Sequence, residues 1–254
     1  IRRFYRDWYR PDLQAIIAIG DFDEKEVQKK IVDLFGQIPK VENPKPRTLE
    51  MIPGHDKTRV AVVTDKEAQM VQLMVFHKHP AITERSTLEY SRDKITHSLY
   101  NAMLNARFRE LVQQAEPPFV MAMSNYSSMV KTSDMYMTMA FLNNPDPSDA
   151  LAALLRENMR VLRFGFNESE LERAKNEYLA SLEKRYNERD NRKSESFAWE
   201  YYRNFTSDEP IPGIEFEYEM IKSFIPGITL EEINALAHKW ITEDNRVVVL
   251  TAPE

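Results

Sequence analysis

The chain has 254 residues, of which 43% are hydrophobic and 29% are charged, and it carries a formal net charge of -6. This composition is expected of a globular protein, and the scattering of basic residues among acidic ones excludes a nucleic-acid-binding patch. The absence of cysteine excludes disulfides, thiolate metal sites and a cysteine nucleophile, and no apolar run approaches the ~20 residues that span a membrane.

The first residues predict a helix, a strand and a second helix. Residues 2–9 place four aromatic side chains on one helical face, and residues 13–20 form a continuous apolar run that is typical of a buried strand. Asp23 and Glu26 have the spacing of a capping box at the start of a helix over residues 24–36. The chain opens with isoleucine, so we expect an excised piece of a longer protein.

A linker separates these elements from the rest of the chain. Residues 37–57 carry four prolines among charged residues, which predicts a domain boundary near residue 50. Two strands follow, over residues 59–65 and 70–79, and then a long helix over residues 83–115.

Two further apolar segments, residues 119–130 and 133–142, predict a hairpin. Met135, Met137 and Met139 lie at two-residue spacing and therefore share one face of the second strand. We interpret this methionine stripe as a packed core face. The alternatives are a copper site or a partner-binding surface.

The rest of the sequence is mainly helical. A helix begins at residues 146–147 and ends at Gly165, and Asn167 with Glu170 caps the next helix, which the charged residues 187–193 interrupt. A further helix carries the aromatic residues Phe197, Trp199 and Tyr202. Thr229 and Glu232 cap the last helix, and a strand over residues 246–251 closes the chain.

A helix with a tryptophan on its apolar face precedes a strand at both ends of the chain, around Trp8 and Trp240. This repeat indicates the last helix and strand of two related domains. We therefore predict an α+β fold with a mixed or antiparallel sheet and helices packed on one side, preceded by the helix-strand-helix tail of a homologous domain. Residues 1–50 form the tail, and residues 51–254 form the second domain.

The chain has five histidines, His55, His77, His79, His97 and His238, as candidate metal ligands. His77 and His79 lie two apart on a predicted strand, so they could hold a metal together with a carboxylate; the competing interpretation is a polar strand end before Pro80. No pair of histidines has the spacing that places two ligands on one helix face. The residues alone therefore indicate an α+β protein with no recognisable active site.

Arg107 and Arg109 are the candidate substrate-binding residues, near the end of the long helix. Residues two apart on a helix point to different faces, so these arginines do not form one clamp. One of them could face a substrate chamber. The alternative is a structural salt bridge or pairing with carbonyl groups at the helix end.

Several segments resemble pitrilysin/insulinase-family zinc metallopeptidases, in particular the large bacterial members built from two halves. The stretch FYRDWYRPDLQAIIAIGDFDEKEV with LFGQIP resembles the end of the family's catalytic domain, and LNARFRELVQQAEPPFVMAMS and RVVVLTAPE resemble the following non-catalytic domain. The resemblance implies a clamshell of homologous α+β domains that encloses peptide substrates. In the family, zinc is held by two histidines of a His-x-x-Glu-His motif and a distant glutamate, and none of these matches a position here.

The resemblance therefore implies a non-catalytic segment that shapes the peptide-binding chamber of a zinc metalloendopeptidase and is inactive by itself. It implies no cofactor in this chain and zinc in the parent protein. The implied partners are peptide or unfolded polypeptide and the other domains of the parent. The implied location is the bacterial envelope or periplasm. Arg109 falls near a family substrate-binding arginine, but Pro117, Pro118 and Phe119 stand where Gly-Tyr is expected. The alternatives are an inactive scaffold or binding subunit of a peptidase-like complex, and an unrelated enzyme that binds metal through His77 and His79.

Overall fold

A computed structural model describes residues 1–143 and 146–254, which form two compact units. The first unit combines Ile1–Leu49 with Glu188–Pro212, and the second combines Glu50–Asn187 with Gly213–Glu254. The first unit gives way to the second after Leu49. The division into the tail of one domain, residues 1–50, and a second domain, residues 51–254, stays a prediction. The return of Glu188–Pro212 to the first unit has no counterpart in the sequence-based division.

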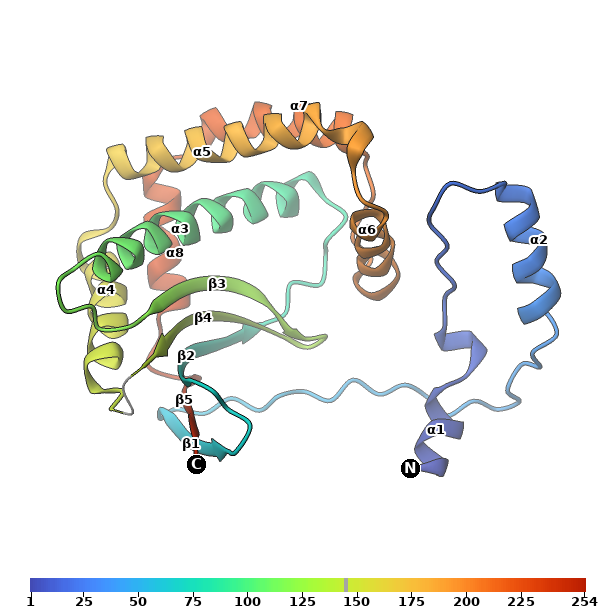
Figure 1. Cartoon of the computed structure of the whole chain (residues 1–254), viewed down its shortest axis with the longest axis horizontal. Coiled ribbons are helices and arrows are strands. Elements are labelled where there is room, and N and C mark those ends of the chain that lie inside the picture. Colours follow the sequence, from blue (N-terminus) through green and yellow to red (C-terminus); the bar gives the residue numbers. More distant parts are fainter. Residues whose placement is uncertain (144–145) are drawn as a thin grey trace. The chain divides into compact units, whose positions relative to one another are not determined.

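The second unit contains a mixed five-stranded sheet in the order β1-β5-β2-β4-β3 (Figure 1). Strand β1 runs parallel to β5, and the other neighbouring strands are antiparallel. The strands are β1 (Arg59–Asp65), β2 (Val71–Pro80), β3 (Met121–Val130), β4 (Ser133–Leu142) and β5 (Arg246–Pro253). The α+β class and the mixed sheet predicted from the sequence are confirmed.

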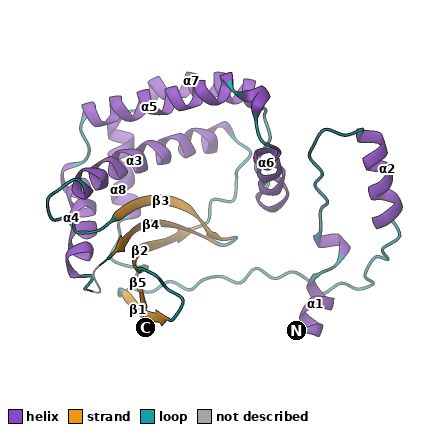
Figure 2. Cartoon of the chain, viewed as in Figure 1, coloured by secondary structure: helices purple, strands orange, loops and turns teal. Residues whose placement is uncertain are grey.

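Helices pack on one side of this sheet, as Figure 1 and the helix-and-strand colouring of Figure 2 show. The helical elements are α3 (Leu88–Val112), α4 (Ser148–Phe164), α5 (Glu168–Asn187), α7 (Ile214–Phe224), the 3-10 turn η3 (Ile225–Gly227) and α8 (Leu230–Trp240). Buried side chains from β2, β4 and all these helical elements form one hydrophobic core. Because one core joins them, the second unit is held together by apolar burial between helices and sheet.

Short polar motifs begin the helices where the sequence predicts them. The Thr229 side chain and Glu232 form a reciprocal capping box at the start of α8. At the start of α5, the Glu170 N–H donates to Asn167 Oδ1 at 3.0 Å, and the Asn167 N–H donates to Glu170 Oε2 at 2.9 Å. These bonds satisfy backbone donors that have no partner inside the helix. Helix α7 is absent from the sequence prediction. It begins directly after a proline-containing stretch, at Gly213, whose φ of 82° is readily adopted by glycine.

The ring of Trp240 is the centre of an aromatic cluster between α3, α8 and the sheet. Tyr126 and Tyr136 stack on it with centroid distances of 4.7 and 5.2 Å. Tyr100 and His97 meet it edge-on, both at 4.8 Å. Such pairs add stability beyond the burial of their area, so this cluster fixes the last helix against the sheet.

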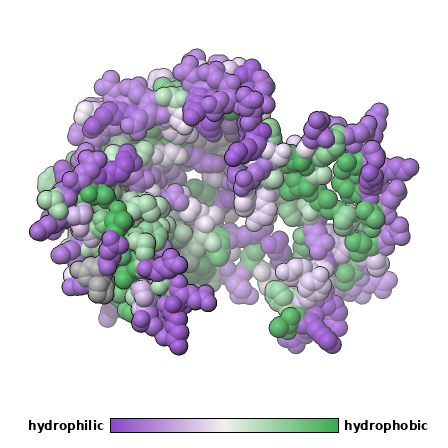
Figure 3. All heavy atoms as spheres, viewed as in Figure 1, coloured by the Kyte–Doolittle hydropathy of each residue, from purple (hydrophilic) through white to green (hydrophobic). Residues whose placement is uncertain are grey.

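The first unit contains α1 (Arg2–Trp8), the 3-10 turn η1 (Pro11–Leu13), α2 (Glu24–Phe35), the 3-10 turn η2 (Arg189–Asn191) and α6 (Ser194–Ser207). None of its three α-helices contains a buried residue. Figure 3 shows hydrophobic residues gathered along the segment that follows α1 and along the adjacent side of α2. The unit therefore has amphipathic elements but little core of its own.

The buried strand predicted over residues 13–20 is not formed. Residues 14–19 belong to no strand, and Ile16 and Ile17 are exposed, at 47% and 40%. The backbone is nevertheless extended at Gln14, the first residue after the η1 turn, where φ and ψ are -119° and 148°. A strand exists only when another strand accepts its hydrogen bonds, and the described residues provide no such neighbour.

The core role predicted for the methionine stripe is also wrong. Met135, Met137 and Met139 do share one face of β4, but the buried positions of that strand alternate with them. Tyr136, Thr138 and Ala140 face the helices, while the methionines are half-buried and lie outside the hydrophobic core. Two-residue spacing identifies a shared face of a strand without saying which face the helices cover.

Candidate functional site

Arg107 is held inside an ion-pair network on the helical side of the second unit. It donates from Nε and Nη2 to the two carboxylate oxygens of Glu170 at 2.7 and 3.0 Å, and from Nη2 to the Gly165 carbonyl at 3.1 Å. Its Nη1 lies 3.9 Å from Glu157 Oε2, and its guanidinium covers the ring of Phe166 at 4.7 Å. This geometry joins α3 to the start of α5.

The carboxyl of Glu170 is the second anchor of this network. Burial raises its pKa, but the hydrogen bonds from the Arg107 side chain and the Asn167 N–H reverse that effect, so the pKa of Glu170 lies below its ordinary value. Arg107 and Glu170 also line a small cavity of about 60 Å³ between α3 and α5. These contacts account for the conformation of Arg107 without a ligand.

Arg109 lies on the same helix and is exposed. Among the residues that the structure describes, its side chain has no hydrogen-bond or ion-pair partner. The two arginines therefore point to different surroundings, as their spacing predicts. A role for either in substrate binding stays a prediction, and Arg109 is the one that remains accessible to a ligand.

His77 and His79 lie on the same face of β2, which is the face that packs toward the helices. The Thr242 N–H donates to His77 Nδ1 at 3.3 Å, and His79 Nε2 lies 3.2 Å from the Trp240 carbonyl oxygen, to which it donates in the matching tautomer. Burial and then the charges of Arg246 and His79 lower the pKa of His77 to about 4. The pKa of His79 is also lowered, chiefly by burial.

The family resemblance implies zinc, and a zinc site needs three or four nitrogen, sulfur or carboxylate ligands from the protein. Across residues 1–143 and 146–254, no three histidine, aspartate or glutamate side chains lie together in a way that could hold a metal ion. Backbone groups of Thr242, in the loop after α8, and of Trp240, the last residue of α8, occupy one ring nitrogen each of His77 and His79. The described residues do not fit a zinc site, and no catalytic step is assigned to them.

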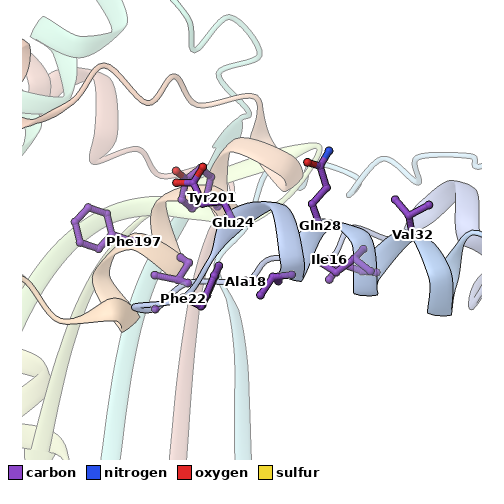
Figure 4. A pocket seen from close by; sticks show the side chains of 12 residues that line it. Ile16, Ala18, Phe22, Glu24, Gln28, Val32, Phe197 and Tyr201 are labelled. Atoms are coloured by element: carbon purple, nitrogen blue, oxygen red, sulfur yellow. The ribbon is translucent and has the colours of Figure 1, made fainter.

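A pocket of about 580 Å³ lies within the first unit (Figure 4). It is lined by the extended segment before α2, by one face of α2 and by two aromatic residues of α6, among them Ile16, Phe22, Val27, Ile31, Phe197 and Tyr201. Most of the lining residues are apolar, and Glu24, Gln28 and Tyr201 add polar groups.

Besides the pocket of the first unit, one face of the sheet in the second unit has no assigned role; we call it the open sheet face. We use this name for the residues of β2, β3, β4 and β5 that alternate with the buried ones and point away from the helices; they include Met74, Phe76, Met123, Met137, Met139 and Val249. None of these six belongs to the core or packs against it. Figure 3 shows hydrophobic residues over β3 and β4. The methionine spacing in the sequence is the signal that identifies this face.

Comparison with known proteins relates the whole chain to one peptidase family. The family model described as Peptidase M16 inactive domain matches residues 1–178. A protein named Zinc protease PQQL-like from Arabidopsis thaliana is 26% identical over 255 residues, which cover 100% of this chain and 24% of the relative. A Probable zinc protease PqqL from Haemophilus influenzae is 23% identical over 257 residues, with 98% and 27% covered. The chain spans about a quarter of the length of these curated relatives.

Solved structures share the fold. The periplasmic protease PqqL from Escherichia coli superposes with a TM-score of 0.82 at 18% identity, covering 98% of this chain and 28% of that one. The first half of the same protease gives the same TM-score and identity, with 53% of that chain covered. A peptidase M16 inactive domain from Pseudomonas fluorescens gives a TM-score of 0.65 at 14% identity, with 92% and 52% covered. In the part of the chain that the structure describes, no helix is long and apolar enough to cross a membrane.

Proposed function

Because the chain belongs to the peptidase M16 family, through that family's inactive domain, we propose that it forms part of the peptide-binding chamber of a longer zinc metallopeptidase. The family match over residues 1–178 carries this proposal, and it agrees with the resemblance derived from the sequence. The relatives named as zinc proteases are about four times longer than the matched region, which leaves room for a metal site elsewhere. The parent's activity, zinc and peptide substrates belong to the proposal.

The first unit is proposed to complete the domain that precedes the second unit. Its extended residues 14–19, its exposed Ile16 and Ile17 and its apolar pocket support this role. An extended segment with free backbone groups and one apolar side gains most when a neighbouring strand pairs with it. Helix α6 supplies Phe197 and Tyr201 to the same pocket, so Glu188–Pro212 acts with residues 1–50 in this proposal.

An envelope or periplasmic location is proposed for the parent protein. Its support is the Escherichia coli neighbour that is described as a periplasmic protease. Fractionation of cells that produce the parent protein is the direct measurement. Recovery of the protein with the cytoplasmic fraction alone would contradict this location.

Reconstitution tests the chamber role. The purified chain is mixed with the segment that the parent gene encodes upstream, and peptide hydrolysis is followed with and without zinc. We expect no hydrolysis by the chain alone and chelator-sensitive hydrolysis by the mixture, because the bond-breaking residues lie outside this chain. Chelator-sensitive hydrolysis by the chain alone contradicts the proposal. An upstream segment without a His-x-x-Glu-His motif supports the inactive scaffold instead.

A strand-breaking substitution tests the role of the first unit. Ile17→Pro removes a backbone donor from the extended segment, and we expect it to abolish association with the upstream segment in gel filtration. Val41→Pro lies in the exposed linker and serves as the control that keeps association. Equal association of both variants would remove strand pairing from the proposal.

A further inference from the structure

Methionines of three strands form a continuous apolar strip on the open sheet face. Met139 of β4 stands in register between Met74 of β2 and Met123 of β3. One pair further along β4, Met137 stands opposite Phe76 of β2. Adjacent strands lie ~4.8 Å apart, so these side chains are neighbours. Unbranched, polarizable methionine side chains adapt to varied partners, and such surfaces bind many sequences rather than one.

Positive charge lies at one end of this strip. Lys78 of β2 is in register with Met135 of β4, and Arg59 of β1 is in register with Val247 on the same face. Burial and the charge of Arg59 lower the pKa of Lys78. At the described open-face positions of all five strands, the one acidic residue is Asp65, at the opposite end of β1. On the open sheet face, therefore, no acidic strand residue lies beside the positive charges of Lys78 and Arg59.

A segment of this chain already lies beside this end. The Thr132 hydroxyl, in the turn between β3 and β4, donates to the Glu50 carbonyl at 2.9 Å. The Lys78 ammonium donates to the Pro53 carbonyl at 2.7 Å. Residues 50–53 thus run from that turn to β2 and are held by their carbonyl oxygens, independent of side-chain identity. These bonds show that polypeptide backbone is an acceptable partner for this end of the face.

We propose that the open sheet face binds an extended, apolar polypeptide segment that carries an acidic side chain, with the apolar residues on the methionine strip and the carboxylate at Lys78 and Arg59. This occupant follows from the charge of the face and from its methionine strip, and it rests on the proposed chamber function. It assigns a substrate preference to that chamber. The positive end fixes the direction of the bound chain, and the methionine strip tolerates different apolar side chains.

Oxidative footprinting tests the position of the binding surface. The probe is a synthetic peptide of about ten residues that alternates leucine with serine and ends in one glutamate, because that length matches a strand. Peroxide converts accessible methionines to sulfoxides, which mass spectrometry quantifies. We expect the peptide to slow oxidation of Met137 and Met139 about fivefold or more, while Met159 of α4, which is 37% exposed, oxidises at an unchanged rate. Unchanged rates at Met137 and Met139 with bound peptide overturn the proposal.

Binding measurements by calorimetry test the chemistry. We expect the paired change Met137→Gln with Met139→Gln to weaken binding about tenfold, and Lys78→Glu to reverse the preference between peptides ending in glutamate and in lysine. Met159→Gln is the matched control, and circular dichroism verifies the fold of each variant. Peptide binding that none of the open-face variants changes overturns this proposal and leaves the chamber function standing. No binding of either peptide to any form of the chain overturns peptide recognition by the chain as well.

Discussion

Arg107 links α3 to α4 and α5 through one side chain, and its loss removes the guanidinium partner of Glu170. Arg107→Ala leaves Glu170 without its guanidinium partner, whereas Glu157 keeps its ion pair with Arg160 at 3.3 Å. Breaking a buried ion pair costs about 3 kcal/mol. We expect the free energy of unfolding in urea to fall by about that amount. Arg109→Ala is the control on the same helix, and we expect its stability to change by less than about 0.5 kcal/mol. Equal losses in both variants would contradict a structural role specific to Arg107.

The same pair of variants separates structure from recognition. If Arg109 contacts peptide in the parent chamber, Arg109→Ala weakens peptide binding while the unfolding curve stays unchanged. A variant that changes neither binding nor stability removes Arg109 from the site. The sequence identifies both arginines as candidates, but only the packing against Glu170 and Phe166 distinguishes one from the other.

The buried histidines make the second unit sensitive to acid. Burial and the nearby charge of Lys239 lower the pKa of His97 to about 4, and its ring lies against Tyr126 and Trp240. A base whose pKa is lower in the folded state contributes stability that is complete above its unfolded pKa of ~6.5 and is lost as the pH falls toward 4. The same sign applies to His77, whose pKa also lies at about 4.

Urea unfolding at several pH values measures this effect. We expect stability to fall from about pH 6.5 to about pH 4, where the full effect is on the order of 3 kcal/mol per histidine. His97→Phe removes one titrating group and keeps an aromatic ring, so its stability should depend less on pH across that range. A pH slope identical to that of the unchanged chain would contradict the burial of a neutral His97.

At the scale of the elements, Gly165 allows α4 and α5 to meet. It has a φ of 70°, and a Cβ atom there would lie 2.5 Å from Nδ2 of Asn234. Asn234 cannot easily move, because its Oδ1 accepts from the Phe166 N–H at 2.8 Å. We expect Gly165→Ala to lower the free energy of unfolding by about 1–3 kcal/mol. Gly227→Ala, where a Cβ would meet nothing within 4 Å, is the control and should change stability little.

Elements with their own start and stop signals could be predicted from the sequence. Helices α5 and α8 begin at capping motifs, and α4 ends at a glycine, so local chemistry determines their bounds. The strand expected over residues 13–20 failed for a different reason. Its apolar run is real, but strand formation requires a neighbour that the described residues do not supply.

At the scale of the whole molecule, the two units differ in how much they bury. Each helix of the first unit lacks a buried residue, whereas α3 alone buries nine. Local opening free energy follows buried apolar contact, so we expect amides of α2 to exchange with solvent much faster than those of α3. Hydrogen exchange with mass spectrometry measures both in one experiment. Addition of the upstream segment should slow exchange in α2 and residues 14–19; equal protection of α2 and α3 in the isolated chain would contradict this division.

The sequence by itself determined the α+β class, the caps of the helices, the alternation of the strands and the family to which the chain belongs, because each depends on local spacing or on ordered segments. Tertiary structure alone decided which face of β4 is covered, which arginine is buried and where Glu188–Pro212 packs. These outcomes depend on contacts between residues far apart in the chain. The methionine spacing revealed a shared face, and only the helices on the opposite side made it an open one.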